Sequence, residues 1–135
     1  MVKQYRLSDH VFFQGFRKDV LQQLAKADIG VLISNSDVHE EGISNTVIEC
    51  MAIGLPVVAS NAGGTGEIID DSKTGFLIEN KDVPRLVSVL TKLIEDADLR
   101  EAIGIAGQQR VNDKFLYQKF LDSYMALYQQ LGKGE

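Results

Sequence analysis

Two glutamates, Glu41 and Glu49, stand eight positions apart around the start of a predicted helix. Residues 43–53 carry apolar side chains at helical spacing, and Gly42 and Gly54 flank them. The free amides and the dipole of a helix N-terminus both favour a bound phosphate. Glu49 lies about two turns inside the helix, where a carboxylate can accept hydrogen bonds from sugar hydroxyls. The segment therefore predicts a site for a phosphate and a sugar.

Strands and helices alternate along the rest of the chain, which predicts an α/β fold with a Rossmann-like parallel sheet flanked by helices. We expect strands at residues 10–15, 29–34, 55–59 and 75–78. Helices are expected at residues 16–27, 43–53, 67–71, 82–95 and 117–131, with a further helix opening at a capping box at residues 98–101. Ligands of open parallel sheets bind beyond the carboxyl ends of the strands, so the loops at residues 15–17, 34–42 and 60–66 are the candidate site.

The order of these motifs resembles the retaining glycosyltransferases of the GT-B fold, family 4, also called glycosyl transferases group 1. The resemblance covers residues 8–125. It rests on Val11-Phe-Phe-Gln-Gly15, Ala27-Asp28, Val31-Leu-Ile-Ser34, the Glu41 to Glu49 segment, Gly54-Leu-Pro-Val-Val58, Gly63-Gly-Thr-Gly-Glu67 and Thr74-Gly-Phe-Leu77. The family often has proline where this chain has Gly66, and the glycine would loosen that turn.

The resemblance implies a role for each candidate residue. Glu41 would be the catalytic residue near the donor sugar and diphosphate, and Glu49 would bind the ribose hydroxyls. The remaining donor-binding residues would be Gly15, Phe16, Gly42, Ile43, Ser44, Asn45, Thr46, Gly63 and Gly64, with Ser44 capping the helix. The implied substrate is a nucleotide diphosphate sugar, UDP- or GDP-linked, with no cofactor and with retention of anomeric configuration.

The resemblance also implies that residues 1–135 are a donor-binding domain truncated on its N-terminal side. A missing first domain would bring a glycan or lipid-linked acceptor, so we expect the chain alone to be inactive. The net charge of −5 argues against nucleic-acid binding. His10, His39 and the single Cys50 form no metal-ligand pattern. No apolar run is long enough to span a bilayer, so a cytoplasmic protein is expected, with peripheral association at the inner membrane face an option for the full-length protein.

Two other readings stay open. The first is a related GT-B enzyme, such as a nucleotide-sugar epimerase or a phosphorylase-like enzyme. The second is a non-catalytic Rossmann-like module used for binding or assembly. The last helix, residues 117–131, carries an apolar stripe, and self-association of the chain through it is a further expectation.

Overall fold

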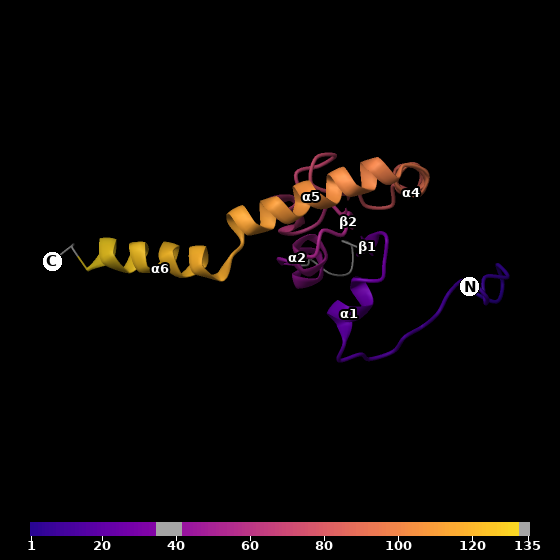
Figure 1. Cartoon of the computed structure of the whole chain (residues 1–135), viewed down its shortest axis with the longest axis horizontal. Helices are drawn as coiled ribbons and strands as arrows, with labels where there is room; N and C mark the ends of the chain where they lie inside the picture. Colours follow the sequence, from indigo (N-terminus) through magenta and orange to yellow (C-terminus); the bar gives the residue numbers. More distant parts are fainter. Residues whose placement is uncertain (35–41, 133–135) are drawn as a thin grey trace.

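The computed structural model describes residues 1–34 and 42–132 of the chain (Figure 1). Within these residues the elements are α1 (Val20–Leu24), β1 (Gly30–Leu32), α2 (Asn45–Ala52), β2 (Val57–Ser60), α3 (Thr65–Ile68), β3 (Phe76–Ile78), α4 (Val83–Glu95), α5 (Ala97–Lys114) and α6 (Tyr117–Leu131). The strands form one parallel sheet in the order β1-β2-β3, which confirms the predicted α/β fold.

The central strand β2 fixes the register of the sheet. Val58 pairs with Val31 of β1 on one side and with Phe76 of β3 on the other. All the residues of β2 are buried, as a parallel strand covered by helices on both faces requires. The apolar, β-branched sequence of β2 suits this position, because successive side chains point to opposite faces and each face meets a helix.

Two apolar clusters cover the two faces of the sheet. On one face, Val57 and Ala59 pack with Val47 and Met51 of α2. On the other face, Val58, Phe76 and Ile78 pack with Val89 and Leu93 of α4. The helices therefore sandwich the sheet, and this leaves its carboxyl edge open for a ligand.

Helix α5 crosses the amino ends of the strands and contributes to both clusters, through Ile103 on one face and Val111 on the other. Two glycines allow this close crossing. A Cβ on Gly104 would lie 2.1 Å from the carbonyl oxygen of Gly54, and a Cβ on Gly107 would lie 2.9 Å from the carbonyl oxygen of Thr74. Both contacts lie at the edge of the sheet opposite the candidate site.

Four sequence-based predictions at element level are wrong. Residues 10–15 form no strand, because no neighbouring strand pairs with them within the described residues. The helix expected at residues 16–27 is only Val20–Leu24, and the one expected at residues 67–71 forms earlier, at Thr65–Ile68. The capping box at residues 98–101 is not used, because Asp96 caps α5 by accepting a hydrogen bond from the Leu99 amide at 2.9 Å.

Two parts of the chain lie away from the sheet. Helix α6 extends beyond α5 at the C-terminal side of Figure 1, and the indigo N-terminal segment leads away on the other side. Neither α1 nor α6 has a buried residue.

No helix within residues 1–34 and 42–132 combines the length and the apolar character needed to cross a membrane.

Candidate functional site

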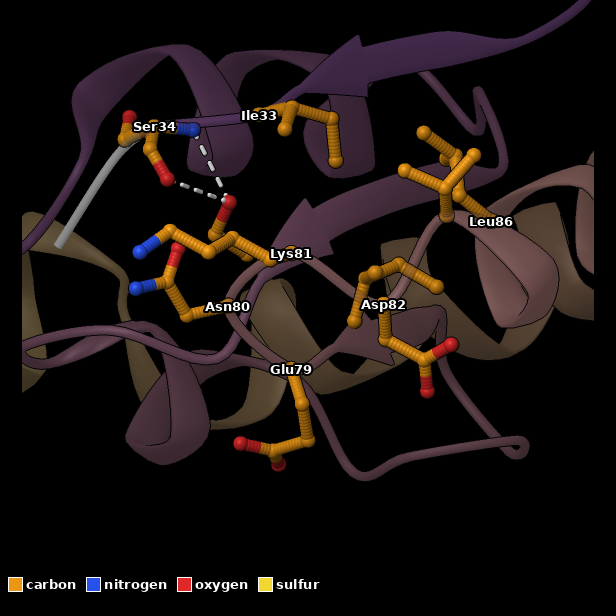
Figure 2. A pocket seen from close by; sticks show the side chains of 10 residues that line it. Ile33, Ser34, Glu79, Asn80, Lys81, Asp82 and Leu86 are labelled. Atoms are coloured by element: carbon orange, nitrogen blue, oxygen red, sulfur yellow. Dashed lines mark hydrogen bonds between the residues drawn. The ribbon is translucent and has the colours of Figure 1, made fainter.

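The carboxyl ends of the three strands share a cavity of about 280 Å³ (Figure 2). Its apolar lining includes Ile33 after β1 and Leu86 of α4. Its polar lining includes Ser34, Ser60 and residues 79–82. Concave sites with apolar walls and a few convergent polar groups are typical of small-molecule binding, and this edge is the expected place in a parallel sheet.

Ser60, the last residue of β2, fixes the point at which the chain leaves β1. Its hydroxyl accepts a hydrogen bond from the Ser34 amide at 2.8 Å and donates one to the Ser34 carbonyl oxygen at 3.0 Å. Figure 2 shows both bonds as dashed lines. Only 8% of Ser60 is exposed. This pair of bonds holds the ends of β1 and β2 together.

The two glycine segments of the predicted donor site meet directly. The Gly64 amide donates a hydrogen bond to the Gly42 carbonyl oxygen at 3.1 Å. A Cβ on Gly64 would lie 2.9 Å from Cγ1 of Ile43 and 3.3 Å from that same oxygen. Gly63, with φ of +53°, makes the turn that this approach needs. The structure therefore brings together segments that the sequence places about twenty residues apart.

Helix α2 begins beside this contact. Ser44 occupies the N-cap position with extended backbone, as predicted, but its side chain makes no capping hydrogen bond. The first bond of the helix joins the Ile48 amide to the Ser44 carbonyl oxygen at 3.3 Å, so the amides of residues 45–47 lie ahead of the helical ladder. Asn45 and Thr46 are exposed. Amides in this position, together with the helix dipole, can bind an anion.

Glu49 is exposed on α2 and lines a second cavity, of about 350 Å³, with residues 18–22 at the start of α1. Arg17 donates two hydrogen bonds to the Asp19 carboxylate at 2.8 and 2.7 Å, and Gln23 donates a third at 2.7 Å. The bonds from Arg17, then the bond from Gln23, lower the pKa of Asp19 to about 2. The cavity therefore holds two carboxylates, and Lys18 stands beside them.

Two predicted site residues, Gly15 and Phe16, are not brought to this place, and the structure does not describe a third. Gly15 has φ of +62°, and a Cβ there would meet nothing within 4 Å. Phe16 is 91% exposed, so the structure does not show it in a base pocket. Glu41 lies outside the described residues. The strand expected to end at Gly15 and the helix expected to begin at Phe16 do not form there, and both residues lie in irregular backbone.

The sequence reasoning missed the loop at residues 79–82, which follows β3 and lines the first cavity. Asn61 connects this loop to the glycine turn. Its side-chain amide donates to the Glu79 carboxylate at 2.6 Å, and its backbone amide donates to the Ile78 carbonyl oxygen at 2.8 Å. Ligands of parallel sheets bind at the loops that follow the strands. Applying this rule to the strand predicted at residues 75–78 would have found this loop.

Cys50 fits a structural role. It is buried in the cluster beneath α2, and burial, followed by the charge of Glu49, raises the pKa of its thiol. A thiol with a raised pKa is a poor nucleophile and metal ligand. Among the residues that the structure describes, no group of His, Cys, Asp and Glu is arranged to hold a metal ion.

Comparison with known proteins relates this geometry to one family. The sequence model of the family described as "Glycosyl transferases group 1" matches residues 1–110. The chain is 28% identical over 128 residues to the N-acetyl-alpha-D-glucosaminyl L-malate synthase of Bacillus anthracis, and the match covers 95% of this chain and 32% of that protein. The chain thus spans about a third of the length of this curated relative.

Solved structures share the fold. The C-terminal domain of a glycosyl transferase group 1 family protein (LpcC) from Francisella tularensis is 29% identical, with a TM-score of 0.71, and the match covers 86% of this chain and 59% of that one. The Anabaena protein HepE in complex with UDP-glucose is 26% identical, with a TM-score of 0.79, covering 98% of this chain and 34% of that one.

Proposed function

The chain belongs to the glycosyl transferases group 1 family, and we propose that it forms the donor-binding half of a retaining glycosyltransferase of the GT-B fold. The observation that carries the proposal is the hydrogen bond between the Gly64 amide and the Gly42 carbonyl oxygen at 3.1 Å. It joins two loops at the carboxyl edge of the sheet and sets them against the N-terminus of α2.

We propose that the diphosphate of the donor binds at this N-terminus. The amides of residues 45–47 precede the first helical hydrogen bond, and the Ser44 side chain makes no capping bond that would compete with a phosphate. Sugar transfer leaves a nucleoside diphosphate, whose negative charge grows in the transition state. Amides fixed by a helix can stabilise that charge without reorganising, and this is the main catalytic contribution we expect from α2.

The ribose of the donor would bind at Glu49. This carboxylate is exposed on α2, and it faces a cavity shared with residues 18–22. A carboxylate accepts two hydroxyl hydrogen bonds in a geometry that suits a vicinal diol. Because both contacts lie on α2, one rigid helix would position the diphosphate and the ribose together. Glu41, which precedes Gly42, is proposed to lie beside the donor sugar.

The donor class is proposed from the comparisons. The HepE structure contains UDP-glucose, and a uridine diphosphate sugar is therefore our first candidate, with a GDP-sugar as the second. We propose that a glycan or lipid-linked acceptor binds outside residues 1–135. Since this chain spans about a third of its curated relative, we expect it to bind the nucleotide without releasing UDP from UDP-glucose on its own. Steady UDP release by the purified chain would contradict that expectation.

Titration calorimetry with UDP, GDP, ADP and their glucose or mannose conjugates tests the proposal. We expect one nucleotide to bind and Glu49→Ala to weaken it roughly 10-fold or more, since hydrogen bonds to a charged group contribute about 1.5–3 kcal/mol. Glu49 is exposed, so the substitution should leave the fold intact.

Glu101→Ala is the matched control, because Glu101 is also an exposed helical glutamate but lies on α5. It should bind the nucleotide as the unmodified chain does. Equal weakening by Glu49→Ala and Glu101→Ala would overturn the assignment of Glu49. Failure of every nucleotide to bind would overturn the proposal that this chain carries the donor site.

A further inference from the structure

The glycine turn leads into a helix that is too short to be stable by itself. Helix α3 has only 4 residues, and its N-cap is Gly64, which also donates to the Gly42 carbonyl oxygen. Gly64 has no side chain that could cap α3, and Gly66 inside α3 is a poor helix residue. A single helical turn gains too few hydrogen bonds to offset its nucleation, so contacts from elsewhere must stabilise α3.

The C-terminal end of α3 carries two carbonyl groups that its own amides do not satisfy. The Gly64 carbonyl oxygen accepts a hydrogen bond from the Glu67 amide at 3.0 Å. The Thr65 carbonyl oxygen accepts one from the Ile69 amide at 2.9 Å. The carbonyl groups of Glu67 and Ile68 come after these two acceptors, at the end where a helix leaves carbonyl groups unpaired. Ile68 is 0% exposed, so its carbonyl oxygen needs a partner within the protein.

Arg110 of α5 is the partner of both carbonyl groups. Its Nη2 donates to the Glu67 carbonyl oxygen at 2.9 Å, and its Nε donates to the Ile68 carbonyl oxygen. Nε and Nη2 lie on the same edge of a planar guanidinium group, so one rigid fork binds two successive carbonyl groups. Its positive charge also suits the C-terminal end of a helix. A lysine here would keep the charge and the apolar stem but would present a single nitrogen.

The glycine turn is held at both of its ends. At the start, the Asn61 backbone amide donates to the Ile78 carbonyl oxygen at 2.8 Å, and its side chain donates to Glu79 at 2.6 Å. At the other end, Arg110 holds α3, which follows directly after residues 62–64. The glycines between these two points have no side chains that could fix their own backbone, so the two ends determine where the turn lies.

We propose that Arg110 is a positioning residue for donor binding, and that it acts through α3 on the glycine turn. A helix of four residues is about 6 Å long, so the contact of Arg110 at one end of α3 lies close to Gly64 at the other. Gly64 in turn bonds to Gly42 at 3.1 Å, beside the N-terminus of α2. This inference rests on the proposed donor site, because the segment that Arg110 positions is the one proposed to receive the diphosphate.

Helix α5 also supplies a matched control for Arg110. Arg100 on the same helix donates to the carbonyl oxygens of Leu93 at 2.6 Å and Ile94 at 3.0 Å, at the C-terminal end of α4. The contact has the same chemistry, but α4 has 13 residues and a side-chain cap at its N-terminus. A loss at the end of this longer helix should therefore stay local. The test compares Arg110→Lys with Arg100→Lys in the full chain.

Hydrogen exchange of the Gly64 amide, followed by NMR without nucleotide, reports on the turn directly. We expect Arg110→Lys to speed this exchange about 10-fold, since it removes about one hydrogen bond from a charged donor. Arg100→Lys should change it by less than about 2-fold, because separate sites act independently. Urea unfolding of both variants gives the global loss of stability, which alone would speed exchange if Arg110 were merely structural. A Gly64 exchange rate that both variants change equally, or that neither changes, would overturn the proposal.

Calorimetry with UDP then tests the role in binding. We expect Arg110→Lys to weaken UDP binding about 5-fold or more, as is typical when one site acts on another, and Arg100→Lys to leave it unchanged. If the unmodified chain and Arg110→Lys bind UDP equally tightly, the positioning role is overturned and the proposed donor site stands. If the unmodified chain binds no nucleotide, the proposed function fails and the positioning role fails with it, which is a different result from equal affinities.

Discussion

Gly104→Ala should destabilise the protein, because α5 passes so close to the turn before β2 that a methyl group does not fit. The new Cβ would lie 2.1 Å from the Gly54 carbonyl oxygen and 3.1 Å from its carbon. An ordinary contact begins at 3.4 Å, so the two backbones must separate by about 1.3 Å (3.4 − 2.1). Both obstructing atoms belong to the backbone, and no side-chain rotation relieves the clash.

The cost follows from what α5 holds in place. Ile103 and Val111 pack into the two apolar clusters, and the Gln108 side chain donates a hydrogen bond to the Ala52 carbonyl oxygen at 2.9 Å. Forcing extra volume into such packing costs about 1–3 kcal/mol. Alanine offsets about 1 kcal/mol of this through its higher helix propensity. With the clash at the upper end of the range, we expect a net loss of about 2 kcal/mol.

Urea unfolding followed by circular dichroism measures this loss. With a denaturant slope of about 2 kcal/mol/M, the midpoint should fall by about 1 M. Gly66→Ala is the control, because its Cβ would meet only the Asn61 side chain at 3.5 Å, and we expect a change within about 0.5 kcal/mol. A Gly104→Ala midpoint equal to or above that of the unmodified chain would refute the close crossing of α5.

Two further predictions concern the candidate site. Gly64→Ala should weaken nucleotide binding about 10-fold with little loss of stability. The new Cβ would lie 2.9 Å from the exposed Ile43 side chain, which can move and shift the start of α2. An unchanged affinity in calorimetry would contradict this prediction. An NMR titration should give Asp19 a pKa of about 2, and Arg17→Ala should return it toward 3.8. Since folding lowers this pKa, the pair of Arg17 and Asp19 contributes to the stability of the fold above pH 3.8, and this contribution is lost as the pH falls through 2. An Asp19 pKa unaffected by Arg17→Ala would show that another group causes the shift.

The sequence predicted the elements whose apolar pattern is local and continuous. The strand expected at residues 55–59 appears as Val57–Ser60, and the last helix forms at Tyr117–Leu131 as expected. The strand is an unbroken apolar run, and the helix keeps one helical spacing of apolar residues from end to end. The meeting of Gly42 with Gly64 also follows from the topology, since loops after neighbouring parallel strands share one edge.

Each feature that the sequence did not predict correctly has its own physical reason. Residues 10–15 have strand-like composition, but a strand needs a neighbour, and composition cannot supply one. The capping-box pattern at residues 98–101 competes with Asp96, whose carboxylate reaches the Leu99 amide and starts α5 earlier. The bond between Asn61 and Glu79 depends on the register of β2 with β3, which no local pattern encodes.

The guanidinium group of Arg110 binds the carbonyl oxygens of Ile68 and Glu67, the latter at 2.9 Å, at the C-terminal end of α3. Helix α3 starts at the glycine turn, so this turn is secured by a side chain more than forty residues later in the sequence. During synthesis on a ribosome, the turn would emerge well before the arginine that secures it. Until then the nascent chain would carry the glycine turn and α3 without this anchor.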